Sequence, residues 1–361
     1  MLDVAIIGAG ISGLACAHYL QKQGYRVAVL EKSRGVGGRL ATRRWGELRL
    51  DHGLPYLSLK SDAAKALQQL VTPLLEQKIL TPWPETIGQL DPQGALSLLP
   101  AHHCYAAPAG MSVIAKYLAQ DLDLQLNQRL VGLWLGEWGK TGLQRHWQLS
   151  LTTPTGEYLS QQAMAVVLAI PAPQALAICT PLVAKGLAPE FIRALEAIDY
   201  APCFSTLALY PAVRQADVQT LPWQALNWSN DPILSWIGLD SSKRPQSEQP
   251  LFVLHSSAEF AQRHLETDPL EPIGQTLLNR AAAVLLDWLD SPVKLQVHRW
   301  RYALPQNYYP AAYLSAPLGQ PLVCCGDWCG GKDLGSALVS GIASATWIQT
   351  QLEAKGVDQS D

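Results

Sequence analysis

The chain has 361 residues, longer than the usual single domain, so we expect two domains or one elaborated domain. Hydrophobic residues make up 48% of it, ample for a core, and a net charge of −3 excludes the basic surface that binds nucleic acid or an anionic membrane. Seven cysteines without regular spacing argue against a disulfide framework. The first predicted strand begins at residue 2, and prolines interrupt the most apolar segment, residues 163–179. We therefore expect a cytoplasmic protein without a signal peptide or membrane span.

The first 31 residues have the pattern of a dinucleotide-binding strand–helix–strand unit. Residues 4–7 form a continuous apolar run, typical of a parallel strand covered on both faces. Gly8, Gly10 and Gly13 follow as G-x-G-x-x-G. Gly8 permits a tight turn, Gly10 lets the backbone approach a pyrophosphate, and Gly13 lets the helix pack closely on the strand.

The helix and strand that follow complete this unit. A helix from about Ser12 to residue 23, with Gly24 as its C-terminal stop, directs its free N–H groups at the phosphate. A second strand over residues 26–30 leads to Glu31, whose carboxylate can accept hydrogen bonds from both ribose hydroxyls. An ordinary glycine turn is the alternative, but the complete combination predicts a bound adenine dinucleotide.

A second glycine-rich loop begins at Lys32 and contains Gly38 and Arg39. The arginine fork can donate two hydrogen bonds to phosphate oxygens. A solvated basic loop is the alternative for Arg39, but its position directly after a dinucleotide motif favours phosphate binding.

The central part of the chain predicts a second domain. Apolar residues recur at helical spacing after residue 59, so we expect residues 59–104 to be an inserted, mostly helical segment. Residues 124–135 and 147–151 alternate like antiparallel strands, and residues 163–170 form a buried strand, with a domain boundary near residue 172. Further strands are expected over residues 204–210, 233–239, 251–256 and 321–325.

Three segments carry a family resemblance: GAGISG (8–13), LEKSRGVGGRLATRR (30–44) and DHG (51–53). Together they resemble the flavoprotein superfamily that includes monoamine oxidases, carotenoid desaturases and renalases. The resemblance implies non-covalently bound FAD, with the first glycines and the acid on its adenosine half and the second glycine loop on its pyrophosphate. It also implies that the segment with Gly53, Pro55 and Tyr56 passes near the flavin.

The resemblance implies three further cofactor contacts. Val131 would touch the adenine through its backbone, and Asp327, after Gly326, would bind the ribityl or phosphate part of FAD. A helix opened by Gly335 would point its N-terminus at the flavin edge where negative charge develops on reduction. Nearby Cys325 and Cys329 are expected to be ordinary thiols, the alternatives being a redox pair or covalent flavin attachment.

Narrower similarity to renalases lies in PILSWIGLDSSKR (232–244), LFVLHSSAEFAQRHLE (251–266) and HRWRYALP (298–305). It implies an oxidase that transfers hydride from 2- or 6-dihydroNAD(P) to flavin N5, with O2 reoxidising the flavin to give NAD(P)+ and H2O2. The candidate catalytic residues are His255 and Trp236; a structural histidine and plain core packing are the alternatives. Arg299 and Arg301 lie on one strand face, predicting either an ion pair that pins the strand or phosphate contact.

The predicted fold class is α/β: a Rossmann-like FAD-binding domain (GR2, p-hydroxybenzoate hydroxylase-like) with a second α+β substrate domain on a mainly antiparallel sheet. The FAD-binding domain would contain residues 1–58, 105–172 and 296–361, and the substrate domain residues 59–104 and 173–295. The expected partners are a small dinucleotide substrate and O2, without metal, nucleic acid or membrane. The alternative functions are an amine oxidase, which usually sets a lysine near flavin N5, a desaturase, and a non-catalytic FAD-binding sensor.

Overall fold

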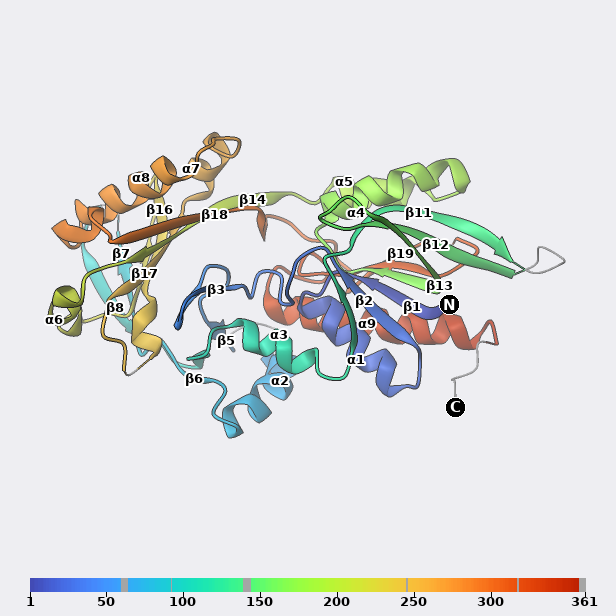
Figure 1. Cartoon of the computed structure of the whole chain (residues 1–361), viewed down its shortest axis with the longest axis horizontal. Helices are drawn as coiled ribbons and strands as arrows, with labels where there is room; N and C mark the ends of the chain where they lie inside the picture. The colour runs from blue at the N-terminus through green and yellow to red at the C-terminus, as the bar shows by residue number, and fades with distance from the viewer. Residues whose placement is uncertain (60–63, 92, 139–143, 245, 317, 357–361) are drawn as a thin grey trace.

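Two large β-sheets occupy the two ends of an elongated molecule (Figure 1). The structure is a computed structural model that describes residues 1–59, 64–91, 93–138, 144–244, 246–316 and 318–356. In this part of the chain no helix is both long and apolar enough to cross a membrane. The predicted fold class is confirmed: a Rossmann-like domain is joined to a second domain built on a mainly antiparallel sheet.

The first sheet contains the N-terminal strand at its centre. Five parallel strands run in the order β10-β2-β1-β13-β20, and β12 and β11 extend the sheet antiparallel from the first half of β13. The apolar run at residues 4–7 is almost completely buried, as the sequence pattern predicts for a central parallel strand. The strands are β1 (Leu2–Ile7), β2 (Val27–Glu31), β10 (Asp123–Leu126), β11 (Arg129–Trp138), β12 (Gln144–Thr152), β13 (Tyr158–Leu168), β19 (Leu314–Ala316) and β20 (Leu322–Cys324).

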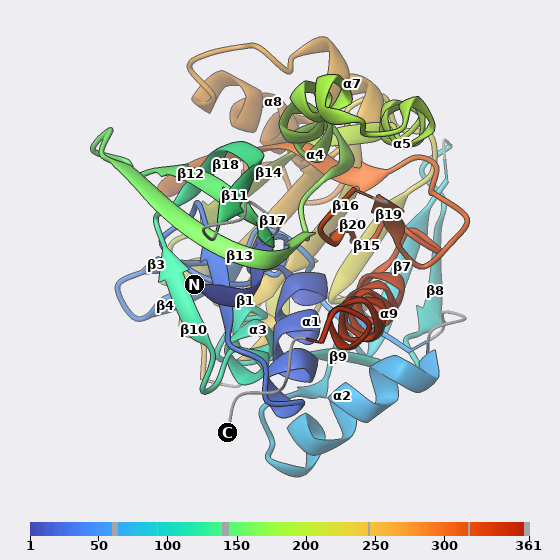
Figure 2. The same ribbon diagram turned by 90° about the vertical axis from the view of Figure 1, so that its right-hand side faces the viewer.

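Helices cover both faces of this sheet. Helix α1 (Ile11–Lys22) and the C-terminal α9 (Leu334–Glu353) lie side by side on one face, together with α3 (Ser112–Leu118) and α2 (Ala64–Glu76) (Figure 2). A side chain at Gly341 would clash with the backbone of Ser12, so glycine allows α9 to cross α1 in contact. Helices α4 (Ala172–Cys179) and α5 (Pro189–Glu196) pack on the opposite face.

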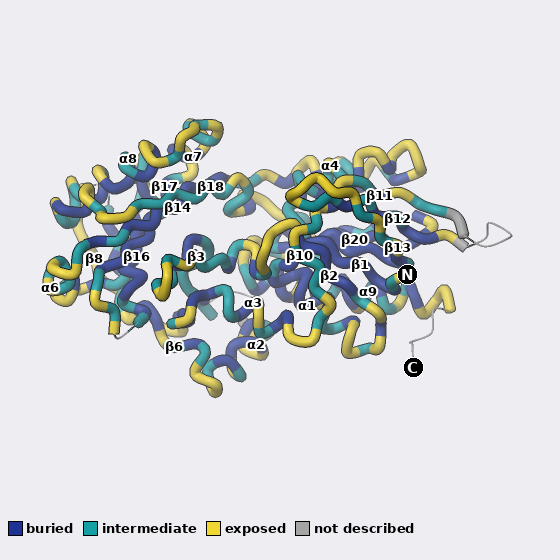
Figure 3. Tube along the Cα trace, in the orientation of Figure 1, coloured by how far each residue is buried: buried dark blue, intermediate teal, exposed yellow. Residues whose placement is uncertain are grey.

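The second sheet has seven strands in the order β18-β14-β17-β16-β15-β7-β8, antiparallel except for the β15–β7 pair. One of its faces is apolar and buried under α7 (Ala258–Arg263) and α8 (Glu271–Ala282) (Figure 3). The short α6 (Gln215–Gln219) connects β14 and β15. The strands are β7 (Thr86–Leu90), β8 (Leu96–Pro100), β14 (Tyr200–Leu209), β15 (Ala225–Trp228), β16 (Leu234–Leu239), β17 (Leu251–Ser256) and β18 (Lys294–Pro305).

Two small sheets lie between the large ones. The hairpin of β3 (Thr42–Trp45) and β4 (Leu48–Asp51) follows the second glycine loop. The other small sheet contains β5 (Leu57–Ser58), β6 (Thr81–Pro82) and β9 (Cys104–Ala106). The hairpin lies against the face of the second sheet that α7 and α8 leave open, because Trp45 Nε1 donates to Gln296 Oε1 of β18 at 3.0 Å.

The division of the chain differs from the predicted boundaries in three places. Residues 59–104 are not mostly helical, because only α2 is a helix and β7 and β8 join the second sheet. Helices α4 and α5 lie beyond the expected boundary at residue 172 but pack on the first sheet. The expected boundary at 296 cuts β18, which belongs entirely to the second sheet. Periodicity reports which residues are buried, but not the sheet on which they are buried.

Candidate flavin and substrate site

The first glycine motif forms the turn that the sequence predicts. Gly8 has φ +104°, a left-handed backbone that favours glycine. A side chain at Gly13 would clash with the carbonyl oxygen of Gly8, so this glycine allows α1 to pack on β1. At Gly10 an added Cβ would meet no atom within 4 Å. Helix α1 begins there without a side-chain cap, so open space faces its free N–H groups, as a bound pyrophosphate requires.

Glu31 is held in place at the end of β2. Its Oε2 accepts a hydrogen bond from the backbone N–H of Ala9, and its Oε1 accepts one from that of Ser33, both at 2.8 Å. Only 8% of the residue is exposed. Each oxygen keeps lone pairs for ribose hydroxyls, so the orientation suits the predicted role. The neighbouring Lys32 is exposed to solvent.

The second glycine loop lies directly against the first. The backbone N–H of Gly37 donates to the carbonyl of Ala9 at 2.8 Å, and a Cβ at Gly38 would lie 3.6 Å from the Cα of Gly10. Arg39 forms a two-pronged ion pair with Asp327, at 2.6 and 2.8 Å, and donates to the carbonyl of Ala303 at 3.0 Å. Arg39 and Asp327, each predicted separately as a cofactor residue, are thus paired although they lie 288 positions apart in the sequence.

The segment after β4 packs on the same loop. A side chain at Gly53 would clash with the carbonyl of Arg39, and the N–H of Leu54 donates to that carbonyl at 2.8 Å. This contact places Pro55 and Tyr56 beside the second glycine loop, with both residues half-buried. The Tyr56 ring then makes an edge-to-face contact with Trp83, with centroids 5.9 Å apart.

The end of β20 and the start of α9 form the C-terminal part of the candidate cofactor site. The N–H of Gly326 donates to Ser340 Oγ at 3.0 Å, which joins the β20 end to α9. Helix α9 starts at Leu334 rather than Gly335, because Asp333 is its N-cap and accepts from the N–H of Ser336 at 2.7 Å. This cap was not predicted from the sequence, although an aspartate just before the predicted helix was a signal for it.

Val131 occupies an irregularity in the meander. The pairing of β11 with β12 shifts between Leu130 and Gly132, which leaves Val131 without a partner on β12. The residue is 44% exposed. Residues just before β11 lie beside β2, because the N–H of Gln128 donates to the carbonyl of Glu31 at 2.9 Å. The backbone of Val131 is therefore unpaired with β12 and lies near Glu31, where the adenosine half of FAD is expected.

The open face of the second sheet carries a polar row. His298 of β18, Ser205 of β14, His255 of β17 and Trp236 of β16 lie directly opposite one another on successive strands, so their side chains share one face. The rings of His255 and Trp236 lie 4.9 Å apart with 34° between their planes. A side chain at Gly238 would clash with the indole of Trp236, so this glycine leaves room for the ring to lie flat.

Several buried polar atoms of this face have no hydrogen-bond partner among the described residues: His255 Nε2, Trp236 Nε1, Ser205 Oγ and the neighbouring His52 Nδ1. Trp300 Nε1 donates to the carbonyl of His52 at 2.7 Å and brings that histidine to the row. Such atoms are costly unless something pairs with them, so they favour a bound ligand. The structure thus brings the two candidate residues His255 and Trp236 together on this face.

The two histidines of the row and the neighbouring His52 are neutral near pH 7. Burial, with the charge of Lys243 as a second cause, lowers the pKa of His255 to about 4. Burial and then the charge of Arg43 lower the pKa of His298 to about 4. Burial, His298 and Arg43 lower the pKa of His52 to about 3. The face therefore offers neutral hydrogen-bonding groups rather than positively charged imidazoles.

A buried ion cluster joins the two domains beside this face. Lys243 Nζ lies 2.7 Å from Asp51 Oδ2 and 2.6 Å from Asp240 Oδ1, and all three side chains are at most 1% exposed. Asp51 Oδ1 accepts from the N–H of Met111 at 2.8 Å, and Arg244 pairs with Asp240. The role of Lys243 was not predictable from the sequence, because its carboxylate partner Asp51 is 192 positions away.

Other predicted residues have structural roles. Arg299 Nη1 donates to the carbonyl of Leu265 at 2.6 Å, and Arg301 pairs with Glu266, so both attach β18 to the chain after α7. Cys325 and Cys329 are free and buried, and burial raises the pKa of the Cys325 thiol to about 12. Among the described residues, no group of three metal-ligating side chains is placed to hold an ion.

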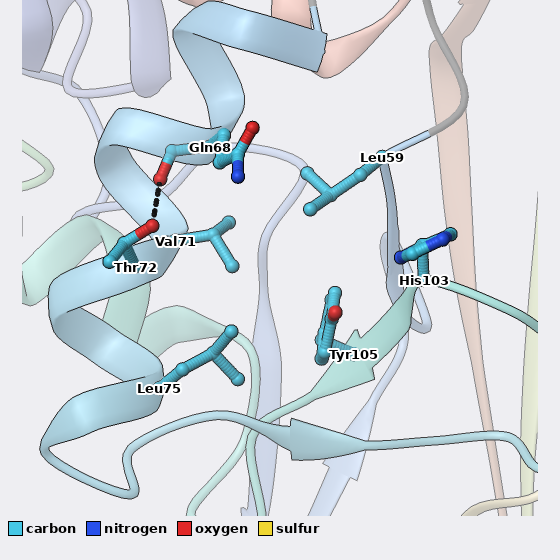
Figure 4. A pocket seen from close by; sticks show the side chains of 7 residues that line it. All are labelled: Leu59, Gln68, Val71, Thr72, Leu75, His103 and Tyr105. Carbon is cyan, nitrogen blue, oxygen red and sulfur yellow. Dashed lines mark hydrogen bonds between the residues drawn. The ribbon is translucent and has the colours of Figure 1, made fainter.

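A cavity of about 260 Å³ lies between α2 and the small sheet of β5 and β9 (Figure 4). Val71 and Leu75 of α2 line one side, and Tyr105 of β9 lines the other. Thr72 Oγ1 donates to the carbonyl of Gln68 within the helix at 2.8 Å. None of the residues predicted for cofactor or substrate lines this cavity, so it is not part of the candidate site.

Comparison with solved structures supports the fold. The chain resembles an engineered putrescine oxidase with a TM-score of 0.70 and 17% identity, over 97% of this chain and 99% of that one. It resembles cyclohexylamine oxidase from Brevibacterium oxydans with a TM-score of 0.69 and 14% identity, over 98% and 99% of the two chains.

Sequence matches to curated proteins are short. A Mycobacterium tuberculosis protein described as a flavin-containing monoamine oxidase is 41% identical over 66 residues, 18% of this chain and 14% of that protein. The flavin-dependent L-tryptophan oxidase RebO of Lentzea aerocolonigenes is 48% identical over 44 residues, 12% of this chain and 9% of that protein. The matched segments thus span about a seventh or less of these relatives.

Two family models match the chain. Residues 6–74 match an NAD(P)-binding Rossmann-like domain, which contains both glycine motifs. Residues 89–348, more than half of the chain, match the flavin-containing amine oxidoreductases. The glycine turns, the oriented carboxylate of Glu31 and the contribution from both ends of the chain suit the FAD that this family implies. This protein belongs to the flavin-containing amine oxidoreductase family.

Proposed function

We propose that this protein is an FAD-dependent oxidase whose substrate is a dihydronicotinamide dinucleotide reduced at ring position 2 or 6. Bound FAD would supply the hydride acceptor at N5 and pass the electron pair to O2. The balanced reaction is dihydroNAD(P) plus O2 plus a proton giving NAD(P)+ and H2O2. The protein's own task is to position the ring and to keep the site neutral.

The observation that carries the proposal is the polar row on the open face of the second sheet. The indole of Trp236 lies over Gly238, where a side chain would clash with it, and a flat nicotinamide ring can stack on an indole. His255 Nε2 and Trp236 Nε1 are buried without partners, and a ring carboxamide offers both a donor and an acceptor. The neutral histidines would not repel the cationic product.

The lack of a lysine in this row, among the residues that the structure describes, also supports the proposal. Hydride transfer from a ring carbon requires no protein acid or base, whereas the amine oxidases that the sequence resembles usually set a lysine near flavin N5. The buried Lys243 is held between Asp51 and Asp240, so it is not free for such a role. The row itself contains two histidines, a serine and a tryptophan.

The narrow renalase resemblance converges on the same face. Its three segments contain β16, β17 and most of β18. In the sheet these strands lie within four neighbouring positions, with β14 between β18 and β17. The resemblance therefore concerns one surface rather than three separate loops, and that surface carries Trp236, His255 and His298.

The proposal is tested by mixing the FAD-loaded protein anaerobically with two sets of donors. Borohydride-reduced NAD+ contains the 2- and 6-dihydro isomers, and fast loss of flavin colour is expected with it but not with ordinary NADH. Primary amines and amino acids form the second set and are expected to leave the flavin oxidised. Bleaching by amines alone would make the protein an amine oxidase, and no bleaching by any donor would favour a non-catalytic FAD-binding protein.

A further inference from the structure

Arg43 on β3 has no hydrogen bond or ion pair within the described part of the chain, and its Nε is buried without a partner. Other partly buried arginines differ in this respect, since Arg39 pairs with Asp327 and Arg244 with Asp240. An unsatisfied buried guanidinium donor is costly, and charge-assisted bonds to phosphate or carboxylate are what this group forms best. Arg43 is therefore poised for an anion that belongs to a ligand.

Arg43 faces the substrate side of the molecule. Alternate residues of a strand share a face, so its side chain lies on the same side of the hairpin as Trp45. Trp45 contacts Gln296 of β18, and Gln296 and His298 share a face of that strand. The charge of Arg43 also reaches His298 and lowers the pKa of that imidazole after burial does. Arg44, one residue on, has the opposite orientation and is exposed.

The two imidazoles that the charge of Arg43 reaches, those of His52 and His298, are neutral and lie among aromatic rings. The rings of His52 and His298 lie 4.8 Å apart, and His298 lies 4.3 Å from Trp300. The buried His52 Nδ1 is also without a partner, so a second polar group is available for the same ligand. A cation beside uncharged rings attracts a phosphate and repels an ammonium group.

We propose that Arg43 binds a phosphate of the dinucleotide substrate. The phosphate would lie at the β18 end of the polar row, and the nicotinamide ring at its β16–β17 end. This inference rests on the proposed function. His298 and His255 are separated by β14, so about 10 Å lies between the two ends at the usual strand spacing. A single ribose joins the nicotinamide ring to the first phosphate and spans such a gap. The site thereby distinguishes a phosphate-bearing dihydronicotinamide from a simple amine.

The test compares two donors that share the reactive ring. Borohydride-reduced NAD+ carries phosphates, and borohydride-reduced 1-methylnicotinamide carries none. In Arg43→Gln the concentration of the dinucleotide that half-saturates anaerobic flavin reduction is expected to rise about 10- to 100-fold, as for loss of a charge-assisted bond. The limiting rate and the response to the phosphate-free donor should stay unchanged. Arg44→Gln is the matched control and should behave as wild type with both donors.

A measurement on the wild-type protein tests the phosphate site even if Arg43→Gln fails to bind FAD. Inorganic pyrophosphate should inhibit reduction by the dinucleotide competitively and leave reduction by the phosphate-free donor unaffected. Arg43→Lys should restore part of the affinity that Arg43→Gln loses. An equal loss with both donors, or no loss with either, overturns the phosphate site but leaves the proposed function standing. If neither donor bleaches the wild type and an amine does, the proposed function and this inference both fail.

Discussion

Gly10→Val is expected to weaken FAD binding severely while leaving the fold intact. Gly10 has φ −78° and ψ 177°, which any residue adopts, and a Cβ there meets no protein atom within 4 Å. The added side chain would instead fill the space beside the α1 N-terminus, where the pyrophosphate is expected. Losing two charge-assisted hydrogen bonds there raises the dissociation constant on the order of 100-fold or more. Titration with FAD, followed by flavin fluorescence, measures the change.

Two neighbouring glycines separate this effect from general damage. Gly13→Val should unfold the cofactor domain, because the new side chain clashes with the Gly8 carbonyl. Gly35→Val should bind FAD normally, because Gly35 is exposed and its Cβ position is open. Unfolding of the FAD-free Gly10→Val protein should match that of FAD-free wild type. Normal FAD affinity in Gly10→Val would place the pyrophosphate elsewhere.

Lys243→Met is expected to destabilise the protein by about 3–5 kcal/mol, the usual result of removing one partner from a buried ion pair. The substitution leaves the Asp51 carboxylate buried without a counter-ion, since Asp51 is 0% exposed and Asp240 keeps Arg244. Urea unfolding of the FAD-loaded protein measures the loss, as a shift in midpoint at constant slope.

Two controls define what that result means. Lys185→Met replaces an exposed lysine and should change stability by less than about 0.5 kcal/mol. Adding Asp51→Asn to Lys243→Met should recover part of the loss, because the asparagine oxygen can still accept from the Met111 N–H without a buried charge. If Lys243→Met alone were as stable as wild type, the ion cluster would not hold the domains together.

Sequence patterns predicted the parts of the site that are local in the chain. The βαβ unit, its glycines and Glu31 lie within 31 residues, and each carries its own physical requirement, such as the left-handed backbone at Gly8. Strand β17 was also predicted at its observed bounds, because its apolar run is buried in a central position of the second sheet.

Long-range pairings were not predictable in the same way. The Arg39–Asp327 and Lys243–Asp51 ion pairs join residues 288 and 192 positions apart. The polar row depends on strand order and register, which periodicity within one strand does not contain. In the sequence, Arg43 is one of several basic residues after the second glycine loop. Its lack of a partner depends on how the hairpin lies against β18, which the sequence does not give.

Family membership alone leaves the substrate open, because curated relatives match only short segments and the solved structures share less than a fifth of their residues with this chain. The most direct measurement of the proposed activity is the stoichiometry of aerobic turnover with borohydride-reduced NAD+. We expect equal amounts of O2 consumed, H2O2 released and NAD+ formed, with only the 2- and 6-dihydro isomers disappearing. Release of H2O2 together with ammonia from an amine, without any NAD+ from the dinucleotide mixture, would contradict the proposed activity.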